Sequence, residues 1–336
     1  MAPPLTRKSA TLHDVAREAG VSPITASRAL SNPAVVSPQT IARVKKAVEA
    51  TGYIPNLLAG GLKSKRSLMV AALVPAISVA QFLPTVEALT DTLDQAGYQL
   101  ILGQSGYDQS REDALLNTMI GRRPDGFVIT GLVRSPAARE QLKRLGIPVV
   151  ETWDLSDRPI DMVVGFSHLK VGSAIAGYFL SKGWHRVGIV TGNDHRAWMR
   201  RDGFVSAVGR DVPTAIVHAP SSLALGRQAL GDLIAQDPAL EAIYCSSDQL
   251  AQGVVTEAQA RGLRVPGDLA ICGFGNAAFA EHMEPSLTTV HVDGAAIGRL
   301  AAQLIVDRCR GVTADQHVFD VGFRIIERQT TRDLAA

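Results

Sequence analysis

The sequence is poor in cysteine and aromatic residues, and it contains no long apolar run. Its three cysteines, Cys245, Cys272 and Cys309, are far apart and form no Cys-x-x-Cys pair. This argues against a disulfide framework and against a cysteine zinc site. No run approaches the ~18 apolar residues of a membrane helix, and the first residues, Met-Ala-Pro-Pro-Leu-Thr-Arg-Lys, lack the apolar core of a secretory signal. We therefore expect a cytoplasmic protein without a membrane partner.

Charge is distributed unevenly along the chain. Residues 1–66 contain ten Lys or Arg and three Asp or Glu, which gives a net charge of +7. The rest of the chain contains 24 basic and 29 acidic residues, which gives −5. A small basic segment joined to a mildly acidic remainder suggests a polyanion-binding module attached to a second part. Charge alone leaves open a solvated basic face without function.

The basic segment has the pattern of a helix-turn-helix. Gly20 supplies the positive φ that a tight turn between two helices needs, and Pro23 is suited to a first helical turn. The second helix is expected to expose Ile24, Thr25, Ser27 and Arg28. Hydroxyl residues suited to capping mark the amino ends of three helices, namely Thr11, Ser22 and Ser37. Two short helices joined in this way favour DNA binding, with an ordinary helical hairpin as the alternative.

A basic linker follows this segment. Pro55 opens a possible short helix, and Lys63, Lys65 and Arg66 close it with positive charge. The pair Gly60-Gly61 lowers its helix propensity by roughly 1.6–2 kcal/mol relative to alanines. We expect residues 56–64 to be unfolded away from DNA and to order only against a groove; a plain linker is the alternative.

From residue 68 onward, short β-branched runs alternate with amphipathic segments, which predicts an α/β body with parallel sheets and right-handed crossovers. The repetition of this pattern suggests two similar lobes facing each other across a cleft. The predicted strands are 69–74, 98–103, 125–130, 147–151, 161–166, 186–190, 214–218, 242–245 and 269–274. The predicted helices lie near 84–96, 111–121, 136–145, 169–182, 200–209, 222–236 and 248–261.

Ligands of open α/β sheets bind beyond the carboxyl ends of the strands, so the residues that follow strands are candidates for a binding cleft. Trp153 is suited either to stacking on a ligand or to the core. Asp248 is interpreted as the amino-terminal cap of the helix near 248–261. The candidate cleft residues are Ser78, Gln81, Phe82, Thr130, Glu151, Trp153, Ser247, Gly275 and Asn276.

The run from Thr11 to Arg28, followed by Gly52-Tyr53-Ile54-Pro55-Asn56, resembles the amino-terminal signature of the lactose-repressor family of bacterial transcription regulators. The resemblance extends over almost the whole chain. It implies a small all-α helix-turn-helix head and a two-lobed α/β body like a periplasmic binding protein, with two parallel sheets and three crossovers. The crossings are expected near Gly165, Asp293 and Asp320.

The resemblance also implies a division of the chain into parts with separate roles. The expected parts are a helix-turn-helix domain at 1–55, a hinge helix at 56–67, and an effector-binding and dimerisation domain at 68–336. Within that last domain, lobe 1 would comprise 68–164 and 293–320, and lobe 2 would comprise 165–292 and 321–336. No leucine heptads follow the last strand, so a dimer meeting a palindrome is expected rather than a coiled-coil tetramer.

The family's DNA contacts fall on particular residues of this sequence. The major-groove readers correspond to Pro23, Ile24 and Arg28, and arginine is suited to bidentate contact with guanine. Thr25, Ser27 and Ser37 are expected to contact phosphates, and Thr11 is placed with them. The hinge contacts correspond to Asn56, Ala59 and Leu62, with Leu62 as the wedge that kinks the minor groove. The expected partner is double-stranded operator DNA.

The effector is expected to be a small anion. The family's ligand-gripping arginine corresponds to Arg200, and many members carry an aspartate where this chain has Gly275. The missing negative charge near Arg200 favours an anionic ligand. The strings VVETWD, VVGFSH and GFGNAAFAEHMEPSL resemble the gluconate-operon repressor branch, which implies gluconate, 6-phosphogluconate or a keto-gluconate. A neutral sugar or nucleobase effector and a co-repressor sign remain open.

One enzymatic alternative is an NAD-dependent oxidoreductase. Gly273-x-Gly275-x-x-Ala278 follows a predicted strand, and Asp293 lies further along, as in a dinucleotide fingerprint. Pro285, however, would cut the intervening helix short. The eight histidines form no His-Glu-x-x-His motif, and no Gly-x-Ser-x-Gly elbow is present. We therefore expect a regulator without catalytic residues, cofactor or metal.

Overall fold

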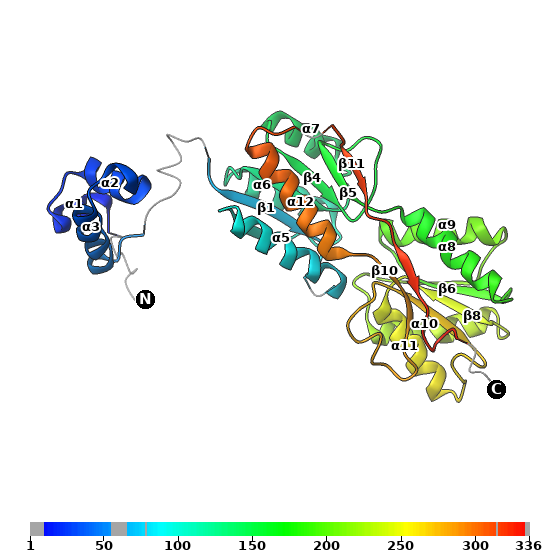
Figure 1. Ribbon diagram of the computed structural model, residues 1–336. Coiled ribbons are helices and arrows are strands. Elements are labelled where there is room, and N and C mark those ends of the chain that lie inside the picture. The colour runs from blue at the N-terminus through cyan, green and yellow to red at the C-terminus, as the bar shows by residue number, and fades with distance from the viewer. Residues whose placement is uncertain (1–9, 55–65, 78, 314, 333–336) are drawn as a thin grey trace, which may run out of the picture. The chain divides into compact units, whose positions relative to one another are not determined.

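The computed structural model describes residues 10–54, 66–77, 79–313 and 315–332. The chain separates into two compact units, residues 1–67 and 68–336, which we call the head and the body (Figure 1). Residues 56–65 of the hinge helix expected at 56–67 lie outside the described residues, and residues 66 and 67 are not helical.

The head consists of short helices whose ends are set by the capping residues expected from the sequence. Thr11 forms a capping box with Asp14, in which its backbone N–H donates to the Asp14 carboxylate at 2.9 Å. Gly20, at φ +60°, ends the first helix in the left-handed conformation. Ser22 and Ser37 cap the next two long helices. The helices are α1 (Leu12–Ala19), α2 (Pro23–Ser31), the 3-10 helix η1 (Pro33–Val35) and α3 (Pro38–Thr51).

A small apolar core joins the three long helices of the head. Val15 on α1, Ala26 on α2 and Val44 on α3 are fully buried in one cluster. The Arg43 guanidinium on α3 donates to the carbonyl of Gly20 at 3.0 Å, and so fixes the turn between α1 and α2. This shared core stabilises α1, α2 and α3, which are too short to be stable as isolated helices.

The body contains two sheets of six strands, one in each lobe. In spatial order, the sheet of lobe 1 contains β11 (Val318–Asp320), β5 (Met162–Gly165), β4 (Val149–Thr152), β3 (Gly126–Thr130), β1 (Met69–Val74) and β2 (Gln99–Gln104). The sheet of lobe 2 contains β12 (Arg324–Ile326), β10 (Thr288–His291), β9 (Ala270–Phe274), β8 (Ala242–Cys245), β6 (Val187–Gly192) and β7 (Thr214–Val217).

Helices cover both faces of each sheet, as parallel sheets require (Figure 1). In lobe 1, α5 and α12 pack on one face and α6 and α7 on the other. In lobe 2, α8 and α9 pack on one face and α10 and α11 on the other. The helices of lobe 1 are η2 (Ala80–Phe82), α5 (Leu83–Gln95), α6 (Gln109–Ile120), α7 (Pro136–Leu145) and α12 (Gly294–Cys309). Those of lobe 2 are α8 (His168–Ser181), α9 (His195–Val208), α10 (Leu223–Gln236) and α11 (Asp248–Ala260).

The chain crosses between the lobes three times, which confirms the expected fold class. It leaves lobe 1 after β5, returns from β10 to α12, and leaves again between β11 and β12. The strands are parallel except for β12, which pairs antiparallel with β10. The last strand therefore differs from the purely parallel sheet that the sequence suggested.

The segment between β9 and β10 decides against a dinucleotide fingerprint. That motif needs a helix directly after its glycines, because the helix amino end holds the pyrophosphate. Residues 275–287 form turns and bends instead. The glycines at 273 and 275 therefore serve another purpose in this fold.

Helix α9 begins earlier than the sequence suggested, at His195 instead of near residue 200. The Asp194 carboxylate caps it by accepting the backbone N–H groups of Arg196 and Ala197, both at 3.1 Å. The extra turn places Arg196 and Arg200 four residues apart on one helix, where their side chains share a face.

Two glycines let α9 lie directly against α8. A Cβ on Gly172 of α8 would overlap the backbone carbonyl of Arg200, and a Cβ on Gly203 of α9 would overlap that of Leu169. The backbones of the two helices are thus in contact, which fixes the position of Arg200 relative to the start of α8.

Candidate functional site

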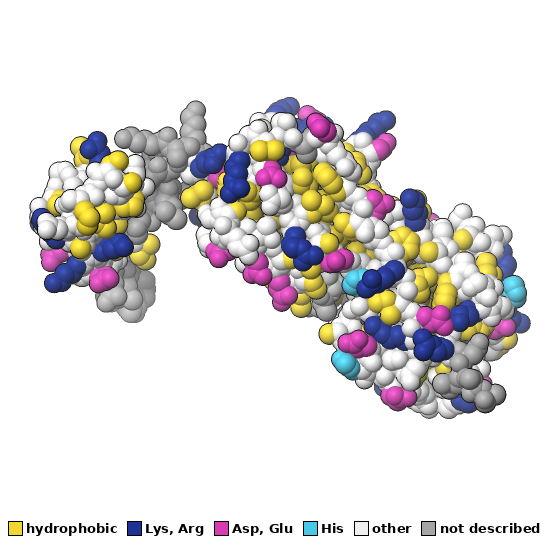
Figure 2. All heavy atoms as spheres, in the orientation of Figure 1, with side chains coloured by type: hydrophobic (Ala, Val, Ile, Leu, Met, Phe, Trp, Pro, Cys, Tyr) yellow, Lys and Arg dark blue, Asp and Glu magenta, His cyan; other side chains and the backbone are white. Residues whose placement is uncertain are grey.

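Helix α2 displays the side chains that the sequence assigned to DNA. Ile24 is 66% exposed, and Ser27 and Arg28 are also exposed, whereas Pro23 and Thr25 are half-buried. Ala26 and Ala29 face the core. On the face of the head seen in Figure 2, lysine and arginine side chains surround a group of exposed hydrophobic ones.

The hydroxyl residues of the head are already engaged in caps. Thr25 Oγ1 lies 2.9 Å from Ser22 Oγ, and Ser37 Oγ donates to Thr40 Oγ1 at 2.9 Å. Hydrogen bonds from Thr11 hold the pKa of the Asp14 carboxyl below its usual value. In the free head these hydroxyls stabilise the helix ends. A contact with a DNA phosphate would be an additional role. Asn56, Ala59 and Leu62 lie outside the described residues.

Between the lobes, two adjoining cavities form a cleft. The inner cavity has a volume of about 50 Å³ and the outer one about 210 Å³. Residues on both cavities are Tyr107, Asp194 and Arg196. Of the candidates from the sequence, Gln81, Phe82, Trp153, Arg200 and Ser247 line the inner cavity and Thr130 lines the outer one. Ser78 lies outside the described residues.

Arg200 is buried at the base of the inner cavity, with 5% of its surface exposed. Its Nε donates to the Tyr244 hydroxyl at 3.0 Å and its Nη2 to the Ser246 carbonyl at 3.1 Å. Its Nη1 lies 2.9 Å from Nδ1 of His168, and its guanidinium stacks over the ring of Phe274 at 4.1 Å. The protein itself therefore engages all three nitrogens of this guanidinium.

His168 links Arg200 to the other lobe. Because a guanidinium only donates, Nδ1 of His168 accepts, and its Nε2–H donates to the Trp153 carbonyl at 2.9 Å. Burial, reinforced by the Arg200 charge, holds the pKa of His168 well below its usual range. A neutral His168 therefore connects the end of β4 in lobe 1 to α9 in lobe 2.

Trp153 belongs both to the core and to the wall of the cleft. Its indole N–H donates to Thr85 Oγ1 at 3.0 Å, and its ring meets Phe82 and Phe166 edge to face. Only 3% of its surface is exposed. With so little exposed surface, it has no free face for stacking on a ligand.

Three arginines lie close together on α9, and each has a different environment. Arg200 is bonded on three nitrogens, and Arg201 stacks over Trp198 at 4.4 Å. Arg196 reaches across the cleft to Phe82 of lobe 1, with 5.3 Å between its guanidinium and the ring centre. The sequence analysis did not name Arg196 as a candidate, although its four-residue spacing from Arg200 is a signal that it shares the same face.

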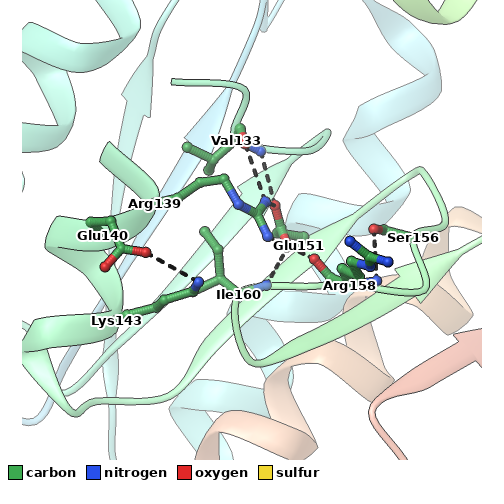
Figure 3. A network of polar contacts seen from close by, with 8 residues as sticks. All are labelled: Val133, Arg139, Glu140, Lys143, Glu151, Ser156, Arg158 and Ile160. Carbon is green, nitrogen blue, oxygen red and sulfur yellow. Dashed lines mark hydrogen bonds and ion pairs between the residues drawn. The ribbon is translucent and has the colours of Figure 1, made fainter. Parts of the chain in front are cut away.

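The structure removes Glu151 from the candidate effector contacts. Its carboxylate is fully buried and accepts the backbone N–H groups of Val133 at 2.9 Å and Ile160 at 2.8 Å. Arg139 bridges to it at 3.2 Å (Figure 3). Burial nevertheless raises the pKa of Glu151. The residue comes at the end of a strand, as predicted, but points into lobe 1 and ties two loops to the sheet.

Asp248 also differs from its expected role as a helix cap. Ser247 caps α11 instead, by accepting the backbone N–H of Leu250. The Asp248 carboxylate is buried and accepts from the Ala277 backbone N–H and the Thr289 hydroxyl. Burial raises its pKa to about 6.

Gly275 and Asn276 occupy the loop that Asp248 holds. Gly275, at φ +126°, has a backbone conformation that side chains disfavour, and a Cβ there would lie 3.3 Å from Gln81 Oε1. The Asn276 side chain points elsewhere, between His291 and Arg328, at 3.2 Å and 2.9 Å. Asn276 is therefore also removed from the effector contacts, because its amide is engaged within lobe 2.

The outer cavity carries carboxylates as well as arginines. Burial raises the pKa of Glu112 and of Asp154, which both line it. Among the described side chains, no cluster of three or more His, Cys, Asp or Glu has the arrangement of a metal site. Of the described helices, none has the length and apolar character needed to cross a membrane.

Comparisons with known proteins agree with this arrangement. Residues 11–56 match the family of bacterial regulatory proteins described as the lacI family, and residues 176–331 match the periplasmic binding protein-like domain. The HTH-type transcriptional regulator GntR of Pseudomonas aeruginosa is 34% identical over 327 residues, which cover 96% of this chain and 95% of that protein.

Two solved structures are similar in sequence and in fold. A LacI-family transcriptional regulator from Silicibacter pomeroyi matches with a TM-score of 0.90 and 32% identity, covering 96% of this chain and 99% of that one. The regulator GntR from Chromobacterium violaceum matches with a TM-score of 0.75 and 34% identity over 78% of this chain and 99% of that one. With a regulator related to it over nearly its whole length, this chain belongs to the LacI family of DNA-binding transcription regulators, which are not enzymes.

Proposed function

We propose that this regulator represses genes for sugar-acid catabolism and leaves a palindromic operator when a small sugar acid such as gluconate binds its cleft. The observation that carries the proposal is the pair Arg196 and Arg200 on the wall of the inner cavity. The nearest carboxylate on that wall, Asp194, is the cap of α9. An enclosed site with two guanidinium groups favours an anion.

The loop after β9 supports an anionic effector. At Gly275 a side chain would point toward Gln81, across the cleft, yet the chain has glycine there. The nearby Asp248 carboxylate is already engaged by Thr289 and Ala277. An aspartate at 275 would place a negative charge beside Gln81, which lines the inner cavity, and its absence removes that repulsion of an anion. The resemblance of the strings around 149–154 and 273–287 to the gluconate-operon repressor branch points to the same class.

For DNA, the proposal assigns α2 to the major groove. Exposed Arg28 would pair with a guanine, and exposed Ile24 would contact a thymine methyl group. Thr11, Thr25, Ser27 and Ser37 would contact phosphates, and the hinge residues Asn56, Ala59 and Leu62 the minor groove. Two such heads meet a palindrome when the protein is a homodimer.

Coupling would run through the contacts that join the lobes. The cleft is bounded by Arg196 and Arg200 of lobe 2 and, on the other wall, by Gln81 and Phe82 of lobe 1. A ligand held by both walls favours the closed arrangement, in which His168 keeps its bonds to Trp153 and Arg200. Effector and operator then weaken each other's binding equally, with a coupling free energy of about 1–3 kcal/mol.

A thermal-shift screen of the full chain tests this function. The ligands are gluconate, keto-gluconates, 6-phosphogluconate, neutral sugars and nucleobases. A ligand that binds only the folded protein stabilises it by about 2.7 kcal/mol at a hundredfold excess over its dissociation constant. Stabilisation by a sugar acid and by none of the neutral compounds supports the proposal. Stabilisation by a neutral sugar or a nucleobase alone would leave a LacI-family regulator with a different effector.

A further inference from the structure

Arg196 carries a buried N–H group that the protein itself does not use. Its Nη1 is shielded from solvent and has no hydrogen-bond partner among the described residues. The atom lies beside Gly131 of lobe 1, and the guanidinium stands over the Phe82 ring. Leaving a buried charged donor without an acceptor costs folding free energy. A bound ligand with an acceptor atom at this position would remove that cost.

The guanidinium of Arg200, in contrast, is fully engaged by hydrogen bonds within the protein. Three of its nitrogens donate to Tyr244, His168 and Ser246, so its position is fixed by the protein before any ligand arrives. Arg200 forms the floor of the inner cavity, whereas Arg196 lines the inner and the outer cavity together. Of the two, Arg196 has the donor that an incoming acceptor would complete.

We propose that Arg196 receives the carboxylate of the effector, and that the hydroxyl chain of the effector extends from there into the outer cavity. This inference rests on the proposed sugar-acid function and assigns to it a residue and a direction. Both the orphan donor and the junction of the two cavities lie at this one side chain. A carboxylate, like a phosphate, matches the geometry of a guanidinium edge, and the lining of the outer cavity decides between the two anions.

The outer cavity determines which sugar acids fit. Glu112, Asp154 and Asp194 all line it, and Asp154 is only 2% exposed. Carboxylates accept hydrogen bonds from hydroxyl groups but repel a second anion in an enclosed site. The other arginine on this cavity, Arg134, is exposed to solvent. The site therefore selects unphosphorylated aldonates over their phosphate esters.

A carboxylate at Arg196 would also act between the lobes. Arg196 belongs to α9 of lobe 2, whereas Phe82 and Gly131 belong to lobe 1. An anion there neutralises the guanidinium at the point where it touches the opposite wall, and so links effector charge directly to lobe closure.

Calorimetric titration of the full chain tests the direction of binding with three matched ligands. These are D-gluconate, D-glucitol, which has a hydroxyl in place of the carboxylate, and 6-phosphogluconate, which adds a phosphate at the other end. We expect gluconate to bind at least tenfold more tightly than either of the others. A phosphate ester that binds as tightly as gluconate, or more tightly, overturns the assigned direction.

Two variants on the same helix test the residue. Arg196→Gln is expected to weaken gluconate binding tenfold to a hundredfold and to abolish the preference for gluconate over glucitol. Arg201→Gln is the matched control, because Arg201 stacks on Trp198 and lines neither cavity. This control variant should bind gluconate with the affinity of the wild type. If both variants bind gluconate as tightly as the wild type, the role of Arg196 is refuted while the sugar-acid function stays intact.

A readout without effector separates binding from a structural role. Arg196→Met keeps an apolar stem near Phe82 and removes the orphan donor, so its melting temperature should equal or exceed that of the wild type. A fall of several degrees would mark Arg196 as structural and overturn the proposal. If the wild type binds no aldonate, the sugar-acid function fails. Arg196 is then judged by sulfate, which must stabilise the wild type more than Arg196→Gln.

Discussion

The head and the body of this protein carry their functional residues in different ways. In the head, the candidate DNA contacts are exposed side chains on one helix, α2, held up by a core of alanines and valines. In the body, the cleft is built from segments that lie far apart in the sequence, and its central arginine is buried among hydrogen bonds. The candidate contacts of the head are local in sequence, whereas the proposed effector contact in the body depends on which donors the fold leaves unused.

This difference predicts that the hydrogen-bonded cleft residue Arg200 contributes strongly to stability, whereas an exposed DNA-contact residue of the head such as Arg28 does not. All three tryptophans, Trp153, Trp184 and Trp198, lie in the body, so tryptophan fluorescence reports the unfolding of the body alone. The head is followed separately by amide exchange of its helices.

The largest effect is expected at Arg200. Arg200→Met leaves the Tyr244 hydroxyl, His168 Nδ1 and the Ser246 carbonyl without their donor, and three such losses cost about 4 kcal/mol. Urea unfolding followed by tryptophan fluorescence measures the loss, with Arg201→Met as the control. A loss below about 1 kcal/mol would mean that the network around Arg200 is weaker than its geometry indicates.

The next effect is a pH dependence at Asp248. Its folded pKa, about 6, lies above the ordinary value of 3.8 because the carboxyl is buried. Its contribution to stability is therefore complete below pH 4 and is lost as the pH rises through 6. Relative to Asp248→Asn, the wild type should lose about 2–3 kcal/mol of unfolding free energy between pH 4 and 7. A constant difference across that range would contradict the assignment.

In the head, the next substitution is expected to change DNA recognition and not stability. Arg28→Ala should reduce discrimination between the operator and a mismatched duplex by about 1–3 kcal/mol, since the bidentate guanine contact is lost. Fluorescence anisotropy with both duplexes measures it. The gluconate affinity and the fluorescence unfolding curve of the body should not change. An equal loss of affinity for both duplexes would make Arg28 a phosphate contact instead.

The smallest effect is expected at the first cap. Thr11→Ala removes the side-chain half of the capping box with Asp14 and should destabilise the head by about 1 kcal/mol. Faster amide exchange in α1 reports the change, while body unfolding stays as in the wild type. A shift in the body transition would contradict the separation of the two units.

The same contrast explains what could be predicted from the sequence. The helix ends of the head and the first nine strands of the body follow from local signals such as Thr11, Gly20 and the β-branched runs, whereas β10, β11 and β12 were not predicted. Residues at strand ends reach the cleft only when their side chains are not engaged elsewhere. Gln81 and Phe82 line the inner cavity, whereas Glu151 is held by Val133, Ile160 and Arg139.

The roles of His168 and Arg196 depend on contacts made by distant segments. His168 bonds to Trp153 and Arg200, which come from different lobes. The position of Arg196 depends on Asp194 starting α9 one turn earlier than the apolar pattern indicated. No local pattern states which hydrogen-bond donors the folded chain already uses, so this part of the site required the structure.

The central claim is that a sugar acid in the cleft weakens the hold of the head on its operator. The most direct measurement is the affinity of the full chain for a palindromic duplex, selected by the protein from a random pool, with and without saturating gluconate. We predict a five- to 150-fold loss of affinity, the range that a coupling of about 1–3 kcal/mol gives. An affinity that saturating gluconate leaves unchanged, or raises, would contradict the account.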